Sequence, residues 1–275
     1  MINVRARTEY SFRKAYGPLQ KVIDACEGDA IGVADGGTWG HVAFSSACRA
    51  ANKKPLFGVE IPVVGDATDR SKQPANDMCF IAKNNTGLKE IYELATRSTS
   101  KENFYYHNRL SYTDLFDITD NVIIISGTHP EWGMLPLTRK NDLYIEMNPM
   151  STRKALDFCE AKGFKPVATS DNYFPKVQDK KAYEVLVGRN RTDRTKPMHI
   201  LNEWELRNCL SWVPDEAFAN TYEIANQCEV ELPVAQMISF DATKTWSRCA
   251  LRVQEKEVSI SRMKFIQLAS RESWT

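Results

Sequence analysis

The sequence predicts an α/β fold in which alternating strands and helices close into a barrel. Two observations carry this prediction. Short apolar runs of strand character alternate with amphipathic stretches of roughly ten or more residues, a pattern typical of parallel βα units. About seven such units would give more short strands than an open sheet accommodates well, so we expect the sheet to close into a barrel. The length of 275 residues suits one large α/β domain or two small ones.

Each predicted element follows from a local pattern. Apolar runs bounded by polar or glycine residues predict strands at 2–6, 30–35, 54–64, 78–84, 121–127, 143–148 and 165–171. Stretches with helical periodicity predict helices at 18–27, 41–52, 86–98, 151–163 and 178–188, and a short helix at 111–118. We interpret 65–77 and 191–197 as surface loops, since both are polar and lack periodicity.

The composition excludes several classes of protein. The net charge of +1 gives no overall basic field for nucleic acid, although a local basic patch could still exist. Seven scattered cysteines without a C-x-x-C pair, and four histidines without metal-binding spacing, favour a reducing cytoplasm over a disulfide framework or a zinc knuckle. We see no signal peptide and no apolar run of membrane-spanning length, so we expect a cytoplasmic protein without a membrane partner.

Polar side chains gather where the predicted strands end. Arg5 and Arg7 share one face of the first strand, and a solvated face is the simplest interpretation of that pair taken alone. Other strands also end in polar residues, namely Asp35, Glu60, Thr128-His129, Glu146 with Asn148, and Asp171. Each acid taken singly could cap the next helix. Because chemistry in βα barrels lies at the carboxyl ends of the strands, the set predicts a shared central site.

The order of these motifs resembles a known family. The segments "RARTEYS", "GVADGGTWGHVAFSSACRAANKKPLFGVEIPV", "FIAKNNTGLKEIYEL", "VIIISG", "LYIEMN", "KPVATSDNYF" and "DEAFANTYEIANQCEVEL" are similar to the PHP (polymerase and histidinol phosphatase) domain at the N-terminus of bacterial DNA polymerase III alpha subunits. The resemblance covers 1–235. It implies a distorted seven-stranded TIM-like (βα) barrel. In active members, three metal ions bound by His, Asp, Glu and sometimes Cys hydrolyse phosphoesters.

The sequence departs from the family at most of these ligand positions. Arg5 and Arg7 stand where the family has H-x-H, and Lys14 stands at a later acidic ligand. The histidine of the family's D-H pair is replaced, leaving Asp35 followed by glycine. Thr128 stands at a Cys or His position with His129 displaced by one place, and Tyr173 replaces the histidine of the closing D-x-H motif. The ligands that survive at matching positions are Glu60 and Asp171.

This pattern predicts an ion-pair network in place of the metal cluster. A cation about 4 Å from a divalent ion costs roughly 8 kcal/mol at an effective dielectric of 20, so two or three cations would exclude metal. The remaining acids would then need the cations as partners. We therefore expect no metal or other cofactor, and an internal network made of Arg5, Arg7, Lys14, Asp35, Glu60 and Asp171. The alternative is one divalent metal ion held by Asp35, Glu60, Asp171 and His129.

The resemblance and its departures imply a role in DNA replication through binding. In the polymerases, this domain supports the catalytic core and in some bacteria docks the proofreading exonuclease. The polymerase palm that follows it there is absent from this sequence, so we expect no polymerase activity. We predict a free-standing, catalytically degenerate scaffold that binds a polymerase or exonuclease subunit, as in a phage or plasmid replisome. The alternative function is a metal-dependent phosphoesterase or a 3′–5′ proofreading exonuclease.

Two further predictions concern peripheral segments. Arg189, Arg191, Arg194 and Lys196 lie close together and could contact a phosphate backbone, which makes DNA a secondary candidate partner. Residues 236–275 match the family poorly. We predict that they form a helical or partner-binding extension of the 1–235 barrel.

Overall fold

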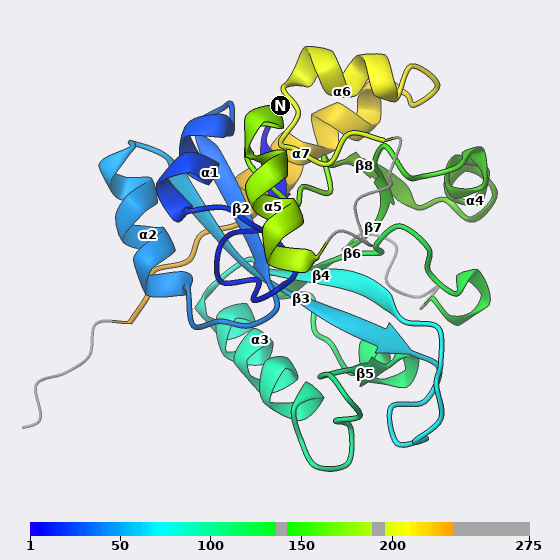
Figure 1. Cartoon of the computed structure of the whole chain (residues 1–275). Coiled ribbons are helices and arrows are strands. Elements are labelled where there is room, and N and C mark those ends of the chain that lie inside the picture. The colour runs from blue at the N-terminus through cyan, green and yellow to red at the C-terminus, as the bar shows by residue number, and fades with distance from the viewer. Residues whose placement is uncertain (136–141, 189–195, 234–275) are drawn as a thin grey trace, which may run out of the picture. The chain divides into compact units, whose positions relative to one another are not determined.

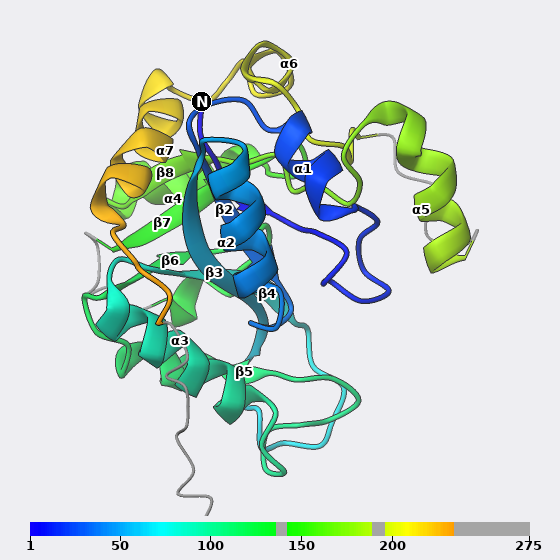
Figure 2. The same ribbon diagram turned by 90° about the vertical axis from the view of Figure 1, so that its left-hand side faces the viewer.

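The structure is a computed structural model that describes residues 1–135, 142–188 and 196–233. Its eight strands form one sheet in the order β1-β2-β3-β4-β6-β7-β8, and β5 pairs with β3. The strands are β1 (Asn3–Ala6), β2 (Ala30–Asp35), β3 (Lys54–Val64), β4 (Asn76–Ala82), β5 (Leu110–Ser111), β6 (Val122–Ile125), β7 (Leu143–Met147) and β8 (Lys165–Ala168). The sheet curls into a distorted barrel (Figures 1 and 2), which confirms the predicted α/β barrel.

Helices cover the outside of this sheet (Figure 1). The α-helices are α1 (Leu19–Ala25), α2 (His41–Ala50), α3 (Asn85–Ser98), α4 (Arg153–Lys162), α5 (Lys180–Val187), α6 (Glu203–Cys209) and α7 (Asp215–Gln227). Short 3₁₀ segments lie at η1 (Tyr112–Phe116), η2 (Trp132–Met134) and η3 (Val177–Asp179). The start of α3 shows how sequence sets a boundary, since the Asn84 side chain accepts hydrogen bonds from the backbone N–H groups of Thr86 and Gly87, each at 3.0 Å.

The predicted pattern of parallel βα units does not hold at β4. This strand runs antiparallel to both of its neighbours, β3 and β6, whereas the other pairs are parallel. The chain passes from β3 to β4 through the loop 65–75, which contains no helix. Without a crossover helix, a strand returns as an antiparallel neighbour of the one before it.

The edge strands β1 and β8 meet through side chains rather than a regular ladder. Asn172 lies just after β8. Its Oδ1 accepts a hydrogen bond from the backbone N–H of Arg7, and its Nδ2 donates one to the carbonyl oxygen of Arg7, both at 3.1 Å. Helix α7 bridges the same two strands: Thr221 accepts the N–H of Ile2 at 3.2 Å, and Asn220 donates to the Pro166 carbonyl at 2.7 Å. These hydrogen bonds therefore link the two edge strands of the curled sheet.

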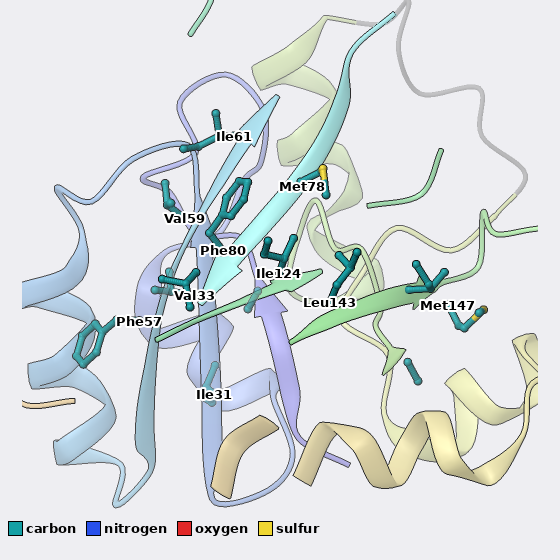
Figure 3. Packing of buried hydrophobic residues seen from close by; sticks show 14 of the residues in the cluster. Ile31, Val33, Phe57, Val59, Ile61, Met78, Phe80, Ile124, Leu143 and Met147 are labelled. Carbon is teal, nitrogen blue, oxygen red and sulfur yellow. The ribbon is translucent and has the colours of Figure 1, made fainter. Parts of the chain in front are cut away.

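Alternate residues of the strands form two apolar layers. The larger cluster lies between the sheet and the helices and includes Val33, Phe57, Phe80 and Ile124 (Figure 3). A second cluster, from the other face of the same strands, includes residues of α7. Glu60 and Glu146 belong to this second face, since they alternate with members of the larger cluster along β3 and β7. The strands thus carry charged side chains into the interior of the barrel.

The chain divides into two units, Met1–Leu232 and Pro233–Thr275. The predicted extension 236–275 lies outside the described residues and stays a prediction. No helix of the described part of the chain combines the length and apolar character that crossing a bilayer requires.

Candidate functional site

Arg5 is one of two buried arginines of the site. It projects from β1 with only 2% of its surface exposed. Its Nη2 lies 2.5 Å from Oε2 of Glu60, and its Nη1 donates to Glu146. The same Nη2 also donates to the carbonyl oxygen of Asp77 at 3.2 Å. A β-bulge in β1 between Asn3 and Ala6 shifts the register against β2, and such a bulge re-aims side chains in this part of a strand.

Arg7 is the second buried arginine of the cluster. Its Nη2 lies 2.6 Å from Oε2 of Glu60, and its Nη1 lies 2.7 Å from Oδ1 of Asp171. Its Nη1 also donates to the carbonyl oxygen of Asn172 at 3.1 Å. The guanidinium lies over the ring of Tyr173, with its central carbon 4.6 Å from the ring centre. Arg7 is 1% exposed, so the interpretation of a solvated strand face does not hold for it.

Lys14 completes the cluster at its solvent side. Its Nζ donates to Oε1 of Glu60 and lies 2.7 Å from Oδ2 of Asp77. The side chains of Lys14 and Asp77 are 32% and 37% exposed, so this end of the cluster contacts solvent. We call the seven charged residues the ion-pair cluster: Arg5, Arg7, Lys14, Glu60, Asp77, Glu146 and Asp171.

Neighbouring cations lower the pKa of two acids of the cluster, Glu60 and Asp171. Burial alone would raise the pKa of Glu60, but attraction to Arg7, Lys14 and Arg5 outweighs it and holds the pKa well below the usual range. Burial likewise opposes ionisation of Asp171, and Arg7 and Arg5 lower its pKa below the usual value. Burial would lower the pKa of Lys14, and Glu60 and Asp77 raise it instead. Glu60 and Asp171 are therefore held in the charged form by the cations around them.

The structure places Asp35 outside the ion-pair cluster, which corrects the expected network. Its Oδ1 accepts the backbone N–H of Thr8 at 2.8 Å and the hydroxyl of Ser11 at 2.6 Å, and its Oδ2 accepts the Thr8 hydroxyl at 2.6 Å. Burial raises the pKa of Asp35, and these hydrogen bonds only partly offset the effect. Neutral donors replace the expected cations because the turn after β1 presents its hydroxyl groups to the end of β2.

Two acids of the cluster were missing from the predicted network. The sequence places Glu146 at a strand end without indicating its partner. It lies on the inner face of β7, where the Thr169 hydroxyl also donates to it. Asp77 falls in the predicted surface loop 65–77, but it is the second residue of β4. The alternation of Glu146 with apolar residues in "LYIEM" was a usable signal for the first. Asp77 could be placed only once the antiparallel return of β4 was known.

The weaker candidates line a small pocket beside the cluster. Thr128, His129 and Tyr173 surround a space of about 230 Å³ together with Arg5, Arg7 and Asp171. The Thr128 hydroxyl accepts a hydrogen bond from Asn148 at 2.8 Å. The backbone N–H of His129 donates to Asn76 at 3.1 Å. These residues therefore shape the opening of the barrel next to the ion pairs.

The predicted nucleic-acid contact lies largely outside the described residues. Arg189, Arg191 and Arg194 fall in the undescribed range 189–195. Lys196 is exposed and lines a separate pocket of about 250 Å³ with Phe174 and His199.

The donor set of the cluster does not fit a divalent metal. Within 1–135, 142–188 and 196–233, no group of three or more His, Cys, Asp or Glu side chains is arranged to hold an ion. Both carboxylate oxygens of Glu60 already accept hydrogen bonds from cations, and Asp171 pairs with Arg7. A metal would have to displace these guanidinium and ammonium groups while remaining a few ångströms from them, which their positive charge opposes.

Comparisons with known proteins find relatives among bacterial polymerase subunits. The chain is 26% identical over 287 aligned positions to the DNA polymerase III subunit alpha of Thermus aquaticus, an alignment that covers 86% of this chain and 23% of that protein. It is 24% identical over 273 positions to the DNA polymerase III subunit alpha of Bacillus subtilis, covering 86% of this chain and 24% of that protein. The chain thus spans about a quarter of the length of these curated relatives.

A solved structure from Bifidobacterium adolescentis, described as a metal-dependent phosphoesterase, aligns with a TM-score of 0.47 and 9% identity, over 78% of this chain and 96% of that chain. The family comparison covers more than half of the sequence, since the PHP domain matches residues 3–144. The resemblance inferred from the motifs is confirmed, and this chain belongs to the PHP domain family.

Proposed function

We propose that this chain is a catalytically degenerate PHP domain that acts in DNA replication as a binding or scaffold module for a polymerase or exonuclease subunit. The observation that carries the proposal is the pairing of Arg5, Arg7 and Lys14 with the buried carboxylates at the barrel mouth. Carboxylates neutralised by side-chain cations are not free to bind and activate a metal-bound water. The barrel mouth then stabilises the fold instead of supporting hydrolysis.

Electrostatic magnitudes favour this role over metal-dependent chemistry. A unit cation about 4 Å from a divalent ion is repelled by roughly 8 kcal/mol at an effective dielectric of 20. Arg5 and Arg7 are both within hydrogen-bonding distance of Glu60, so an ion on that carboxylate would meet both repulsions. Even a several-fold reduction by local screening leaves a penalty comparable with the whole stability of a domain.

The competing function is a phosphoesterase or 3′–5′ exonuclease with one divalent ion on Asp35, Glu60, Asp171 and His129. That site needs these four side chains to converge with free lone pairs. Asp35 instead accepts three hydrogen bonds from Thr8 and Ser11, and the other two acids pair with arginines. These contacts support the binding role over hydrolysis.

The proposed partner is a protein, with DNA secondary. A net charge of +1 gives little nonspecific attraction for a phosphate backbone. The relatives in Thermus aquaticus and Bacillus subtilis are polymerase subunits, which makes replication proteins the first partners to test. A cytoplasmic location fits this role and the six free cysteines of the described residues.

The test is direct binding of the full chain to purified polymerase III alpha subunit and, separately, to purified proofreading exonuclease subunit. Sedimentation velocity should show a complex with at least one of them. Hydrolysis of a phosphoester substrate that requires Glu60, together with no complex in either mixture, would overturn the proposal in favour of the phosphoesterase.

A further inference from the structure

Another hollow, larger than the pocket lined by Thr128 and His129, opens beside Lys14, Glu60 and Asp77 and has an aromatic lining. Its volume is about 970 Å³. We call it the aromatic cleft, after the rings of Tyr10, Phe12, Trp39, Tyr106, Tyr173 and Tyr183 that line it. These rings come from the turn after β1, the loop after β2, the segment before β5, the segment after β8, and α5. Five separate parts of the chain therefore converge on one concave, aromatic surface.

Three of these rings are exposed to solvent to a degree that folding alone does not explain. Phe12 is 69% exposed, Trp39 is 55% exposed and Tyr106 is 86% exposed. Phe12 and Trp39 stack on each other with their centres 5.6 Å apart and their planes 14° apart. Single exposed apolar residues are ordinary, but a group of large rings around one cleft is typical of a binding surface.

The backbone holds the Trp39 ring in a fixed position. Its Nε1 donates to the carbonyl oxygen of Tyr10 at 3.1 Å. The ring lies so close to Gly37 that a Cβ atom at that position would stand 1.9 Å from it, and a Cβ at Gly40 would stand 2.7 Å from the Tyr10 ring. The glycines of "ADGGTWG" therefore make room for two rings of the cleft. A side chain held in place before binding loses little entropy when a partner arrives.

Two residues of the cleft have a left-handed backbone. Arg13 has a φ of 57° and Tyr106 a φ of 60°, a conformation uncommon for bulky side chains. Such backbone strain collects at functional sites more than elsewhere. Both residues line the aromatic cleft.

The charges of the cleft indicate what it binds. Arg13 is exposed, and it forms no ion pair with any residue of the described part of the chain. Lys14 lines the same wall but already pairs with Glu60 and Asp77. The aromatic cleft thus offers several apolar rings and one available guanidinium, which would complement an apolar side chain next to a carboxylate.

We propose that the aromatic cleft is a docking site for a short segment of a partner protein that carries an aromatic or aliphatic side chain beside an acidic residue. Trp, Tyr and Arg are the residue types that dominate binding energy at protein interfaces, and all three are present here. The proposal rests on the binding role above and adds the location and chemistry of the contact.

Single-stranded nucleic acid is the less favoured occupant. Bases can stack on aromatic rings, but such sites also track the phosphate backbone with several cations. Among the described residues that line the cleft, the arginine and lysine side chains are Arg13 and Lys14. Lys14 is already paired with Asp77.

The test uses a displayed library of short random peptides selected on the full chain. The most enriched peptide is then synthesised and titrated against purified variants. We expect enriched peptides to pair an apolar residue with an acid, and Trp39→Ala to weaken their binding about tenfold or more, as for a hot-spot residue. Trp204 is a matched control, because it is 73% exposed on α6 and does not line the cleft, so Trp204→Ala should leave binding unchanged.

A glycine pair gives a second, gentler comparison. Gly37→Ala should weaken peptide binding because the new methyl group must displace the Trp39 ring. A Cβ at Gly133 meets nothing within 4 Å and Gly133 does not line the cleft, so Gly133→Ala should bind normally. Arg13→Glu should reduce binding of acidic peptides, with Arg49→Glu on α2 as its exposed control. Variants are compared only where circular dichroism shows the wild-type fold.

The outcomes separate this inference from the proposed function. Absence of enriched peptides, or equal binding to wild type and Trp39→Ala, would overturn the docking site. Oligothymidylate binding that depends on Trp39 and exceeds peptide binding would assign the cleft to nucleic acid instead. If a polymerase or exonuclease subunit binds Trp39→Ala as well as wild type, the binding role stands and the cleft is wrong. If peptides need Trp39 but no replication subunit binds, the cleft stands and the replication role fails.

Discussion

Arg7 binds Glu60 through three hydrogen bonds: its Nε lies 3.1 Å and 3.0 Å from the two carboxylate oxygens, and its Nη2 lies 2.6 Å from Oε2. Both side chains are almost fully buried. Glu60 also accepts hydrogen bonds from Arg5 and Lys14. This one carboxylate therefore links β1, β3 and the turn that follows β1. A charge so deeply placed depends on its partners, which makes the pair a sensitive point of the fold.

Replacing Arg7 with methionine should destabilise the protein. Met fills part of the same volume but leaves Asp171 without its closest cation and Glu60 with one cation fewer. We expect the free energy of unfolding in urea to fall by about 3 kcal/mol, the cost of breaking a buried ion pair from one side. Arg13→Met, at an exposed position in the same turn, is the control and should unfold like wild type. Equal midpoints for both variants would contradict the structural role of Arg7.

Glu60 and Asp35 should respond differently to loss of charge. Glu60→Gln removes the anion shared by three cations, so we expect a loss of about 3 kcal/mol in the free energy of unfolding. Asp35→Asn keeps the shape and faces only the neutral donors of Thr8 and Ser11, so we expect a loss of about 1 kcal/mol. Urea unfolding of the two variants side by side is the measurement. A larger loss for Asp35→Asn would show that the cations depend less on Glu60 than the contacts indicate.

The depressed pKa values of Glu60 and Asp171 predict sensitivity to acid. Both groups have a lower pKa in the folded state than in the unfolded chain, so their stabilising contribution is complete above the unfolded value of about 4. It is lost as pH falls through that value toward the lowered folded pKa. Asp35 acts in the opposite direction, because its folded pKa is raised and its contribution is lost as pH rises. Urea unfolding below pH 5 should therefore show a steep loss of stability in wild type and a shallower one in Arg7→Met.

The sequence predicted the strands well because apolar runs report burial directly. The run "KPLFGVEIPVV" matches β3 from Lys54 to Val64. Strand direction was not predictable in the same way, since an apolar run looks the same in a parallel and an antiparallel neighbour. Strand β4 is antiparallel because its connection to β3 contains no helix. This direction places Asp77 beside Lys14, a contact that the sequence did not indicate.

The site was harder to predict because the turn after β1 determines which side chains contact each buried acid. Asp35 and Glu60 are both acids on neighbouring strands, and nothing local to either residue separates them. The turn after β1 decides the outcome, since Thr8 and Ser11 reach Asp35 while Lys14 reaches Glu60. Glu146 was hard to place for a different reason. The alternation of residues along β7 indicates that it is buried, but its pairing with Arg5 depends on the curvature of the whole sheet, which the sequence does not show.

The metal content of the purified protein tests the functional assignment most simply. We expect zinc, manganese and iron well below one ion per chain by elemental analysis, and no phosphatase or 3′–5′ exonuclease activity with added Mn²⁺, because Arg5 and Arg7 repel a divalent ion at Glu60. Arg7→Met is informative here as well, since removing one guanidinium should raise metal affinity without completing a ligand set. Near-stoichiometric metal in wild type, with hydrolysis lost in Glu60→Gln, would contradict this assignment and favour the phosphoesterase. Wild-type activity in Glu60→Gln would instead indicate a contaminating enzyme, which a repeat purification can remove.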